Sequence, residues 1–146
     1  MAKKILTILV LVIISSCNLN FGKLKDFEKN SEEANLRLKV QLGIGNEEII
    51  SDLNYFMDET GIDPYYIASF KANNKLVTKI VERLNMTIYK EGKYIWIPEG
   101  SPSWFAPSID YKNNEFPTYI MEKPGRKEFL YFDGNNKNCF YANFSW

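Results

Sequence analysis

The chain has 146 residues, and its 18 basic and 18 acidic side chains give a formal net charge of zero at pH 7. A chain without a basic excess lacks the electrostatic signature of a nucleic-acid-binding protein, so we expect no nucleic-acid partner. There is no histidine, and there are only two cysteines. This composition excludes Ser-His-Asp and Cys-His catalysis and disfavours a zinc site, so we expect neither a metal nor another cofactor.

The first residues have the organisation of an export signal. Lys3 and Lys4 precede an apolar run over residues 5–14, in which Thr7 is the one polar residue. A helix of that length extends about 15 Å, half of the roughly 30 Å of a bilayer core. The run is therefore too short to span a membrane and has the length of a signal-peptide core.

The run leads into Ile14-Ser15-Ser16-Cys17, which resembles the lipobox of bacterial lipoproteins: an apolar residue, two small residues and a cysteine. The resemblance implies cleavage before Cys17, a diacylglycerol thioether on its sulfur and usually a third acyl chain, such as palmitate, on its amine. Since each buried CH₂ contributes about 0.8 kcal/mol, two or three chains anchor a protein stably. The alternatives are an ordinary signal peptide with a chance cysteine, or a short buried helix.

The resemblance also implies a location in the cell envelope. The residue after the cysteine is Asn18 rather than aspartate. In a Gram-negative cell this implies export to the outer membrane, facing the periplasm. In a Gram-positive cell the same signal would leave the protein on the outer face of the plasma membrane.

Cleavage after residue 16 would leave 130 residues with 16 basic and 18 acidic side chains, a net charge of −2. We interpret residues 17–30 as the lipidated cysteine and a flexible polar tether, and residues 31–146 as a single globular domain. With Cys17 lipidated, Cys139 has no partner for an internal disulfide. We expect a buried, inert thiol, with an intermolecular bridge as the alternative.

In the first half of the domain, two patterns compete. Serine followed by two acids at residues 31–33 is typical of a helix start, but apolar residues then recur at every second position and favour a strand over 36–42. The alternating residues are Leu36, Leu38, Val40 and Leu42. We expect a short helix over 46–52 that passes into a strand over 53–58, and a further strand over 65–70.

The second half combines one helix with strands. Five apolar residues on one stripe predict a helix over about 75–85: Leu76, Val77, Ile80, Val81 and Leu84. Residues 86–146 hold 15 of the 22 aromatics, and turn residues divide them into expected strands at 87–90, 93–97, 117–122, 129–132 and 139–146. The predicted fold is α+β: a small, mostly antiparallel β-sheet with one principal helix packed on it.

The loop over residues 98–107 is the candidate binding site. It carries three prolines with Trp104 and Phe105, and Tyr94 and Trp96 precede it. Flat aromatic faces beside polar side chains suit sugar recognition, and rigid aromatics also anchor protein interfaces. We take these four aromatics as candidate partner- or glycan-binding residues. The alternative is that Trp104 and Phe105 plug the open end of the sheet as part of the core.

Two polar clusters have simpler explanations. The run 133–138 supplies oxygen ligands but lacks the closing glutamate of a calcium loop, so we expect a hairpin turn. Four acids gather at Asp52, Asp58, Glu59 and Asp63. Two of them could act as a glycosidase pair across a cleft, but solvated turn acids are the simpler interpretation.

Because the chain lacks a recognisable catalytic set, we expect a non-enzymatic protein. The leading hypothesis is a lipid-anchored envelope module that binds a partner protein, as an inhibitor, an immunity protein or an accessory protein. The alternative is a lipoprotein that binds carbohydrate, such as a cell-wall glycan. No motif in residues 31–146 identifies a domain family.

The lipobox generates a direct prediction. Cys17→Ser removes the sulfur that would carry the lipid, so the variant should leave the membrane fraction and appear in the soluble fraction after cell lysis. The measurement is a comparison of both fractions by immunoblot. If the variant stayed as tightly membrane-associated as the original chain, the prediction of a lipid anchor at Cys17 would be wrong.

Overall fold

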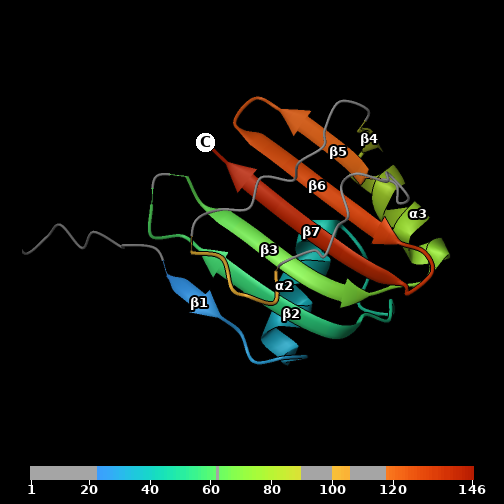
Figure 1. Cartoon of the computed structure of the whole chain (residues 1–146). Helices are drawn as coiled ribbons and strands as arrows, with labels where there is room; N and C mark the ends of the chain where they lie inside the picture. Colours follow the sequence, from blue (N-terminus) through green and yellow to red (C-terminus); the bar gives the residue numbers. More distant parts are fainter. Residues whose placement is uncertain (1–22, 62, 90–99, 106–117) are drawn as a thin grey trace, which may run out of the picture.

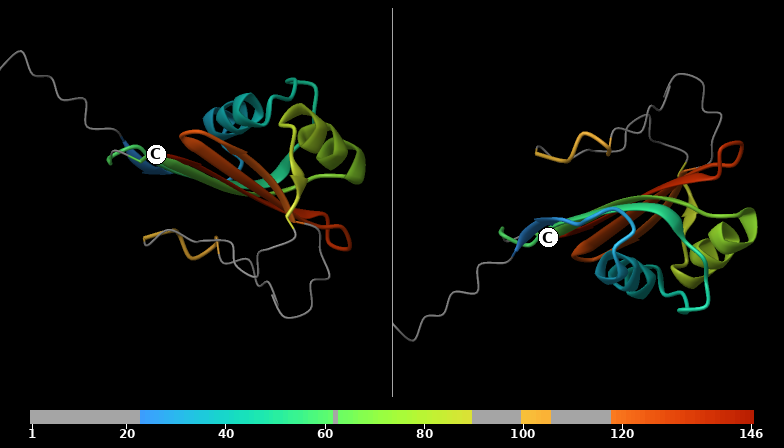
Figure 2. Two further views of the ribbon diagram at one scale, coloured as in Figure 1. Left: turned by 90° about the horizontal axis from the view of Figure 1, so that it is seen from above. Right: turned by 90° about the horizontal axis from the view of Figure 1, so that it is seen from below.

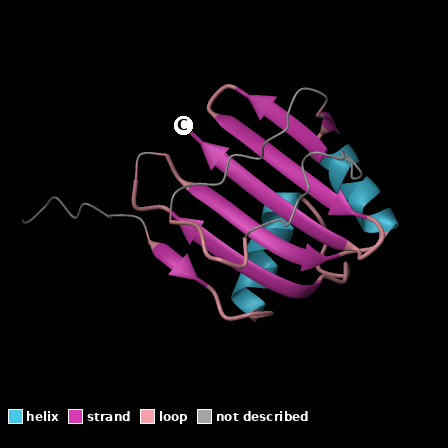
Figure 3. Ribbon diagram, viewed as in Figure 1, coloured by secondary structure: helices cyan, strands magenta, loops and turns pink. Residues whose placement is uncertain are grey.

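The computed structural model describes residues 23–61, 63–89, 100–105 and 118–146 (Figure 1). Its elements, in chain order, are β1 (Leu24–Asp26), α2 (Glu32–Leu42), β2 (Ser51–Asp58), β3 (Tyr65–Lys71), α3 (Asn74–Arg83), β4 (Thr87–Ile88), β5 (Thr118–Lys123), β6 (Arg126–Asp133) and β7 (Asn138–Ser145). The strands form one sheet in the order β1-β2-β3-β7-β6-β5-β4, and each described pair of neighbours is antiparallel. The predicted α+β class with a mostly antiparallel sheet is confirmed. Among the described residues, two helices, α2 and α3, accompany the sheet, where one principal helix was predicted (Figure 3).

Both helices lie on the same side of the sheet, which we call the helix face (Figure 2). Residues 100–105 lie on the opposite side, which we call the aromatic face (Figure 2). The side chains buried on the aromatic face form a separate cluster of Phe56, Ile67, Phe105, Phe129, Ala142 and Phe144. The sheet therefore has a core on each of its faces.

Strand β7 contributes side chains to both cores, as β2, β3 and β6 also do. Cys139 and Tyr141 face the helix side, whereas Ala142 and Phe144 face the aromatic side, because successive side chains of a strand point in opposite directions. Cys139 is completely buried, and this burial raises the pKa of its thiol to about 12. The expected buried thiol is confirmed.

The strand predicted over residues 36–42 is wrong, because this segment forms the end of α2. Ser31 caps the helix by accepting a hydrogen bond from the Ala34 N–H at 3.3 Å. Gly43 ends it in the left-handed conformation, with φ of 64°. Both caps lie outside the alternating run that favoured a strand.

Two further expectations are wrong. The predicted tether to residue 30 ends earlier, because β1 pairs with β2 and Phe27 is buried against the helix-face core. The short helix predicted over 46–52 is absent: β2 begins at Ser51, and the preceding residues form turns. Ordering these few residues into a single helical turn would cost more conformational entropy than the hydrogen bonds of that turn return. Glu48 instead forms an ion pair with Lys79 of α3.

Most of the other predicted elements are confirmed. Strand β3, helix α3, strand β5 and the closing β6–β7 hairpin lie where the pattern places them. The hairpin turn holds together through Asp133, which accepts hydrogen bonds from the N–H groups of Asn135 and Asn136. The strand expected at 93–97 lies outside the described residues. Strand β4, its expected hairpin partner, pairs with β5.

The helix face also buries a carboxylate. Glu128 of β6 has no exposed surface, and it accepts a 2.7 Å hydrogen bond from the Tyr141 hydroxyl. Arg126 Nε lies 2.5 Å from the other carboxylate oxygen, and Asn143 Nδ2 donates to the Tyr141 hydroxyl at 3.2 Å. A buried charge is tolerated when it has such partners. Burial and the nearby Glu128 hold the pKa of Tyr141 well above its usual value, so this hydroxyl remains a donor.

This network predicts a stability difference. Tyr141→Phe removes the hydroxyl that donates to the buried carboxylate, so it should lower the free energy of unfolding by about 1.5–3 kcal/mol. Tyr66→Phe is the matched control, since its hydroxyl bonds the partly exposed Glu59, and it should cost about 1 kcal/mol or less. Urea unfolding of both variants measures the difference. An equal loss in the two would contradict the proposed role of the buried network.

Candidate functional site

Helix α2 carries apolar side chains on two sides. Leu38 and Leu42 are completely buried and anchor the helix on the sheet. Leu36 and Val40 are 53% and 72% exposed. Residues four apart lie on the same side of a helix, so Leu36 and Val40 form a continuous apolar strip facing solvent. Exposed apolar residues grouped in this way are a feature of binding surfaces.

A groove runs beside this strip. It has a volume of about 440 Å³, and we call it the α2 groove. Residues of α2 form one wall, and residues of β2, β3 and the turn between them form the other. Its lining residues are Glu33, Leu36, Arg37, Val40, Gln41, Tyr55, Glu59 and Tyr66. Aliphatic and tyrosine side chains therefore share the groove with charged ones.

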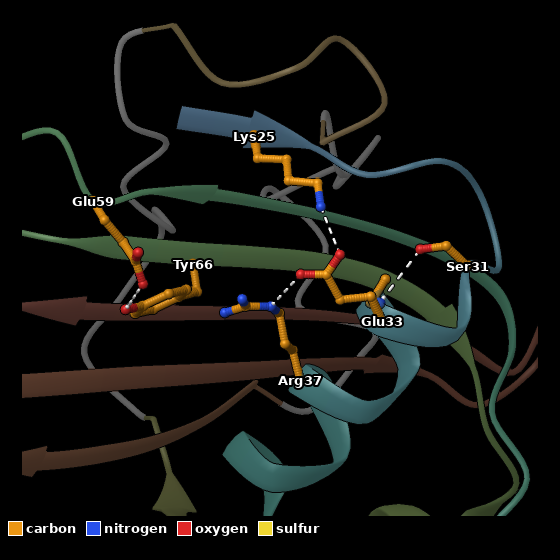
Figure 4. A network of polar contacts seen from close by, with 7 residues as sticks. Lys25, Ser31, Glu33, Arg37, Glu59 and Tyr66 are labelled. Carbon is orange, nitrogen blue, oxygen red and sulfur yellow. Dashed lines mark hydrogen bonds and ion pairs between the residues drawn. The ribbon is translucent and has the colours of Figure 1, made fainter. Parts of the chain in front are cut away.

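The charged residues take part in two sets of polar contacts, one around Glu33 and one between Glu59 and Tyr66 (Figure 4). The Glu33 carboxylate lies 2.6 Å from Lys25 Nζ and 3.1 Å from Arg37 Nε. Hydrogen bonds from these two cations lower the pKa of Glu33 and keep it ionised. Figure 4 shows the end of the Arg37 guanidinium directed toward Tyr66, whose hydroxyl donates to Glu59 at 2.7 Å.

The two tyrosines of the groove are held in their neutral form. Burial, the hydrogen bond to Glu59 and the charge of Glu59 raise the pKa of Tyr66 to about 12. Burial is also the main cause that raises the pKa of Tyr55. Both hydroxyls therefore stay protonated near neutral pH, and the partly exposed Tyr66 presents its ring and hydroxyl to the groove, whereas Tyr55 is buried.

The structure separates the two aromatics of the predicted loop. Phe105 is only 2% exposed, and its ring packs against Phe140 with centroids 6.3 Å apart. It belongs to the core, as in the alternative that treats it as a plug, and its assignment as a contact residue is wrong. Trp104 is partly exposed, and its ring meets Phe105 edge-on at 6.0 Å.

Trp104 lines a second hollow, of about 210 Å³, which we call the Trp104 pocket. Besides Trp104, its lining consists of Lys29, Asp52, Asn54, Ser69, Phe70, Lys71, Asn138, Cys139 and Phe140. The pocket thus combines an indole ring with charged and amide side chains from several strands. Of the other predicted site residues, Cys17, Tyr94 and Trp96 lie outside the described residues.

Within the described ranges, no group of three or more Cys, Asp or Glu side chains is placed to hold a metal ion. Among the same residues, no helix has both the length and the apolar character needed to cross a membrane.

Sequence reasoning missed the α2 groove. In the sequence, Leu36 and Val40 belong to a strand-like alternation, and Arg37 and Tyr66 lie 29 positions apart. The available signal was the helix start at residues 31–33. In a helix that begins there, Leu36 and Val40 lie on the side opposite the buried leucines. The polar residues of the Trp104 pocket are brought together by strand pairing, for which the sequence carries no signal.

The chain was compared with protein-family models, curated proteins and solved structures, and none of them matches it.

Proposed function

We propose that this protein is a lipid-anchored component of the cell envelope that binds a partner protein through the α2 groove and catalyses no reaction. The observation that carries the proposal is the exposed pair Leu36 and Val40 on a helix whose other side is fully buried. The anchor at Cys17 is supported by the lipobox resemblance. Inhibitor, immunity and accessory roles all require such a surface.

The composition of the groove is typical of a protein interface. Apolar area removed from water contributes about 25 cal/mol per Å², and the exposed pair supplies such area without unfolding any element. Tyrosine and arginine are the residue types that most often dominate binding energy, and Tyr66 and Arg37 line the groove, whereas Tyr55 is buried beneath it. Tyrosine rings also lose little conformational entropy when a partner immobilises them.

The charges of the groove indicate the kind of partner segment. The Nε of Arg37 contacts Glu33, while the end of its guanidinium is directed toward Tyr66, which lines the groove (Figure 4). A guanidinium pairs well with a carboxylate at close range. We therefore propose a partner segment that places apolar side chains on Leu36 and Val40 and an acidic side chain near Arg37.

The proposal predicts the outcome of affinity capture. The full chain, tagged at its C-terminus and expressed in the source cell, should retain one envelope protein in near-stoichiometric amount. Val40→Glu puts a charge into the apolar strip, so it should reduce the retained amount by at least about tenfold. Quantitative mass spectrometry of the retained protein measures the change.

The matched control is Ile88→Glu. Ile88 is 60% exposed on β4, at the opposite edge of the sheet order from the strands next to α2, so this variant should retain the partner fully. Equal retention by the Val40→Glu and Ile88→Glu variants would contradict the assignment of the α2 groove. Capture of no protein at all would contradict the function itself.

A further inference from the structure

The Trp104 pocket lies on the aromatic face, at the end of the sheet where β3 finishes and β7 begins. Lys71 and Asn138 are paired across these two strands, and both line the pocket. Residues 100–105 supply Trp104, and the segment after β1 supplies Lys29. The pocket is therefore separate from the α2 groove, which lies on the other face.

An irregularity in β2 shapes the pocket. The pairing register with β3 shifts between Ser51 and Asn54, and Asp52 within this interval has a φ of 52°. A left-handed residue other than glycine is uncommon, and bulges of this kind redirect side chains. Here the bulge brings the Asp52 carboxylate toward two lysines and leaves Asn54 lining the pocket.

The charges of the pocket do not cancel. Asp52 Oδ1 lies 3.4 Å from Lys29 Nζ, and Asp52 Oδ2 lies 2.8 Å from Lys71 Nζ. Hydrogen bonding to Lys71, together with the charges of both lysines, lowers the pKa of Asp52 and keeps it ionised. Two ammonium groups thus share one carboxylate, which leaves one unit of positive charge beside the pocket.

The remaining lining provides neutral hydrogen-bonding groups next to an aromatic ring. Asn54 Nδ2 donates to Ser69 Oγ at 3.0 Å, which fixes both side chains against the pocket wall. Asn138 adds a second amide group. Trp104 has its position set by Phe105, which is anchored in the core. An indole beside amides and a hydroxyl suits a ligand with one apolar face and several hydroxyl groups.

We propose that the Trp104 pocket binds an acidic saccharide, meaning a sugar ring that bears a carboxylate. Trp104 covers the C–H face of the ring, and Asn54, Ser69 and Asn138 bond its hydroxyl groups. The carboxylate is held by the positive charge that Asp52 leaves uncompensated on Lys29 and Lys71. This site does not depend on the partner bound in the α2 groove.

The test is calorimetric titration of the full chain, purified in detergent, with methyl glucuronide and methyl glucoside. The two probes share a ring and differ by the carboxylate. Methyl glucuronide should bind with the lower Kd, by up to about fivefold at low salt, the size of one exposed ion pair. This preference should shrink at high salt, since exposed charges are screened.

Variants separate the contributions. Trp104→Ala should weaken both probes by roughly tenfold or more, because it removes the ring that covers the sugar. Trp146→Ala is its control, since Trp146 is 59% exposed and follows the far end of β7. Lys71→Gln should abolish the preference for the glucuronide, and Asp52→Asn should increase it; both variants leave Trp104 in place.

Several outcomes would overturn the proposal. If neither sugar bound at tens of millimolar, a saccharide site would be excluded. The same would follow if Trp104→Ala bound the sugars as tightly as the original chain. Equal Kd values for the two sugars would exclude the acidic component. Inorganic phosphate binding as tightly as the glucuronide would assign the pocket to small anions instead.

Discussion

The architecture depends on the burial of β7 on both faces. Its side chains alternate between two cores, so each side of the sheet must be covered. Helices α2 and α3 cover one side, and Phe105 packs into the cluster on the other. Tyr141 on the same strand also holds the buried carboxylate of Glu128, which joins β6 to β7 by a side-chain contact. Binding surfaces remain where these covering elements leave side chains exposed.

Both candidate sites lie at the edges of the elements that cover the sheet. The α2 groove runs along the flank of the helix that covers β2. The apolar strip beside it is the side of α2 that does not pack on the sheet. The Trp104 pocket lies next to the Phe105 plug, where the bulge at Asp52 redirects charged and amide groups. The two sites occupy opposite faces, so a protein partner and a small ligand need not compete. An anchor at Cys17 would hold both close to the envelope surface.

The elements that could be predicted from sequence are those with a single strong pattern. Helix α3 has one apolar stripe and an asparagine cap, and the β6–β7 hairpin has its turn residues between apolar runs. Helix α2 was missed because Leu36 and Val40, the residues proposed to bind a partner, make its pattern alternate like a strand. Local rules are expected to fail where residues are kept for function rather than folding. Trp104 and Phe105 are equivalent in a sequence, and only long-range packing makes one a core residue and the other a pocket residue.

The central claim is that the outer side of α2 contacts another envelope protein, and photocrosslinking in intact cells tests it most directly. A photoreactive amino acid would replace Val40 in the full chain, and Ile88 in a control. The account predicts one discrete adduct from position 40, containing a single envelope protein, and none of that adduct from position 88. No adduct from position 40, or the same adduct from both positions, would contradict it.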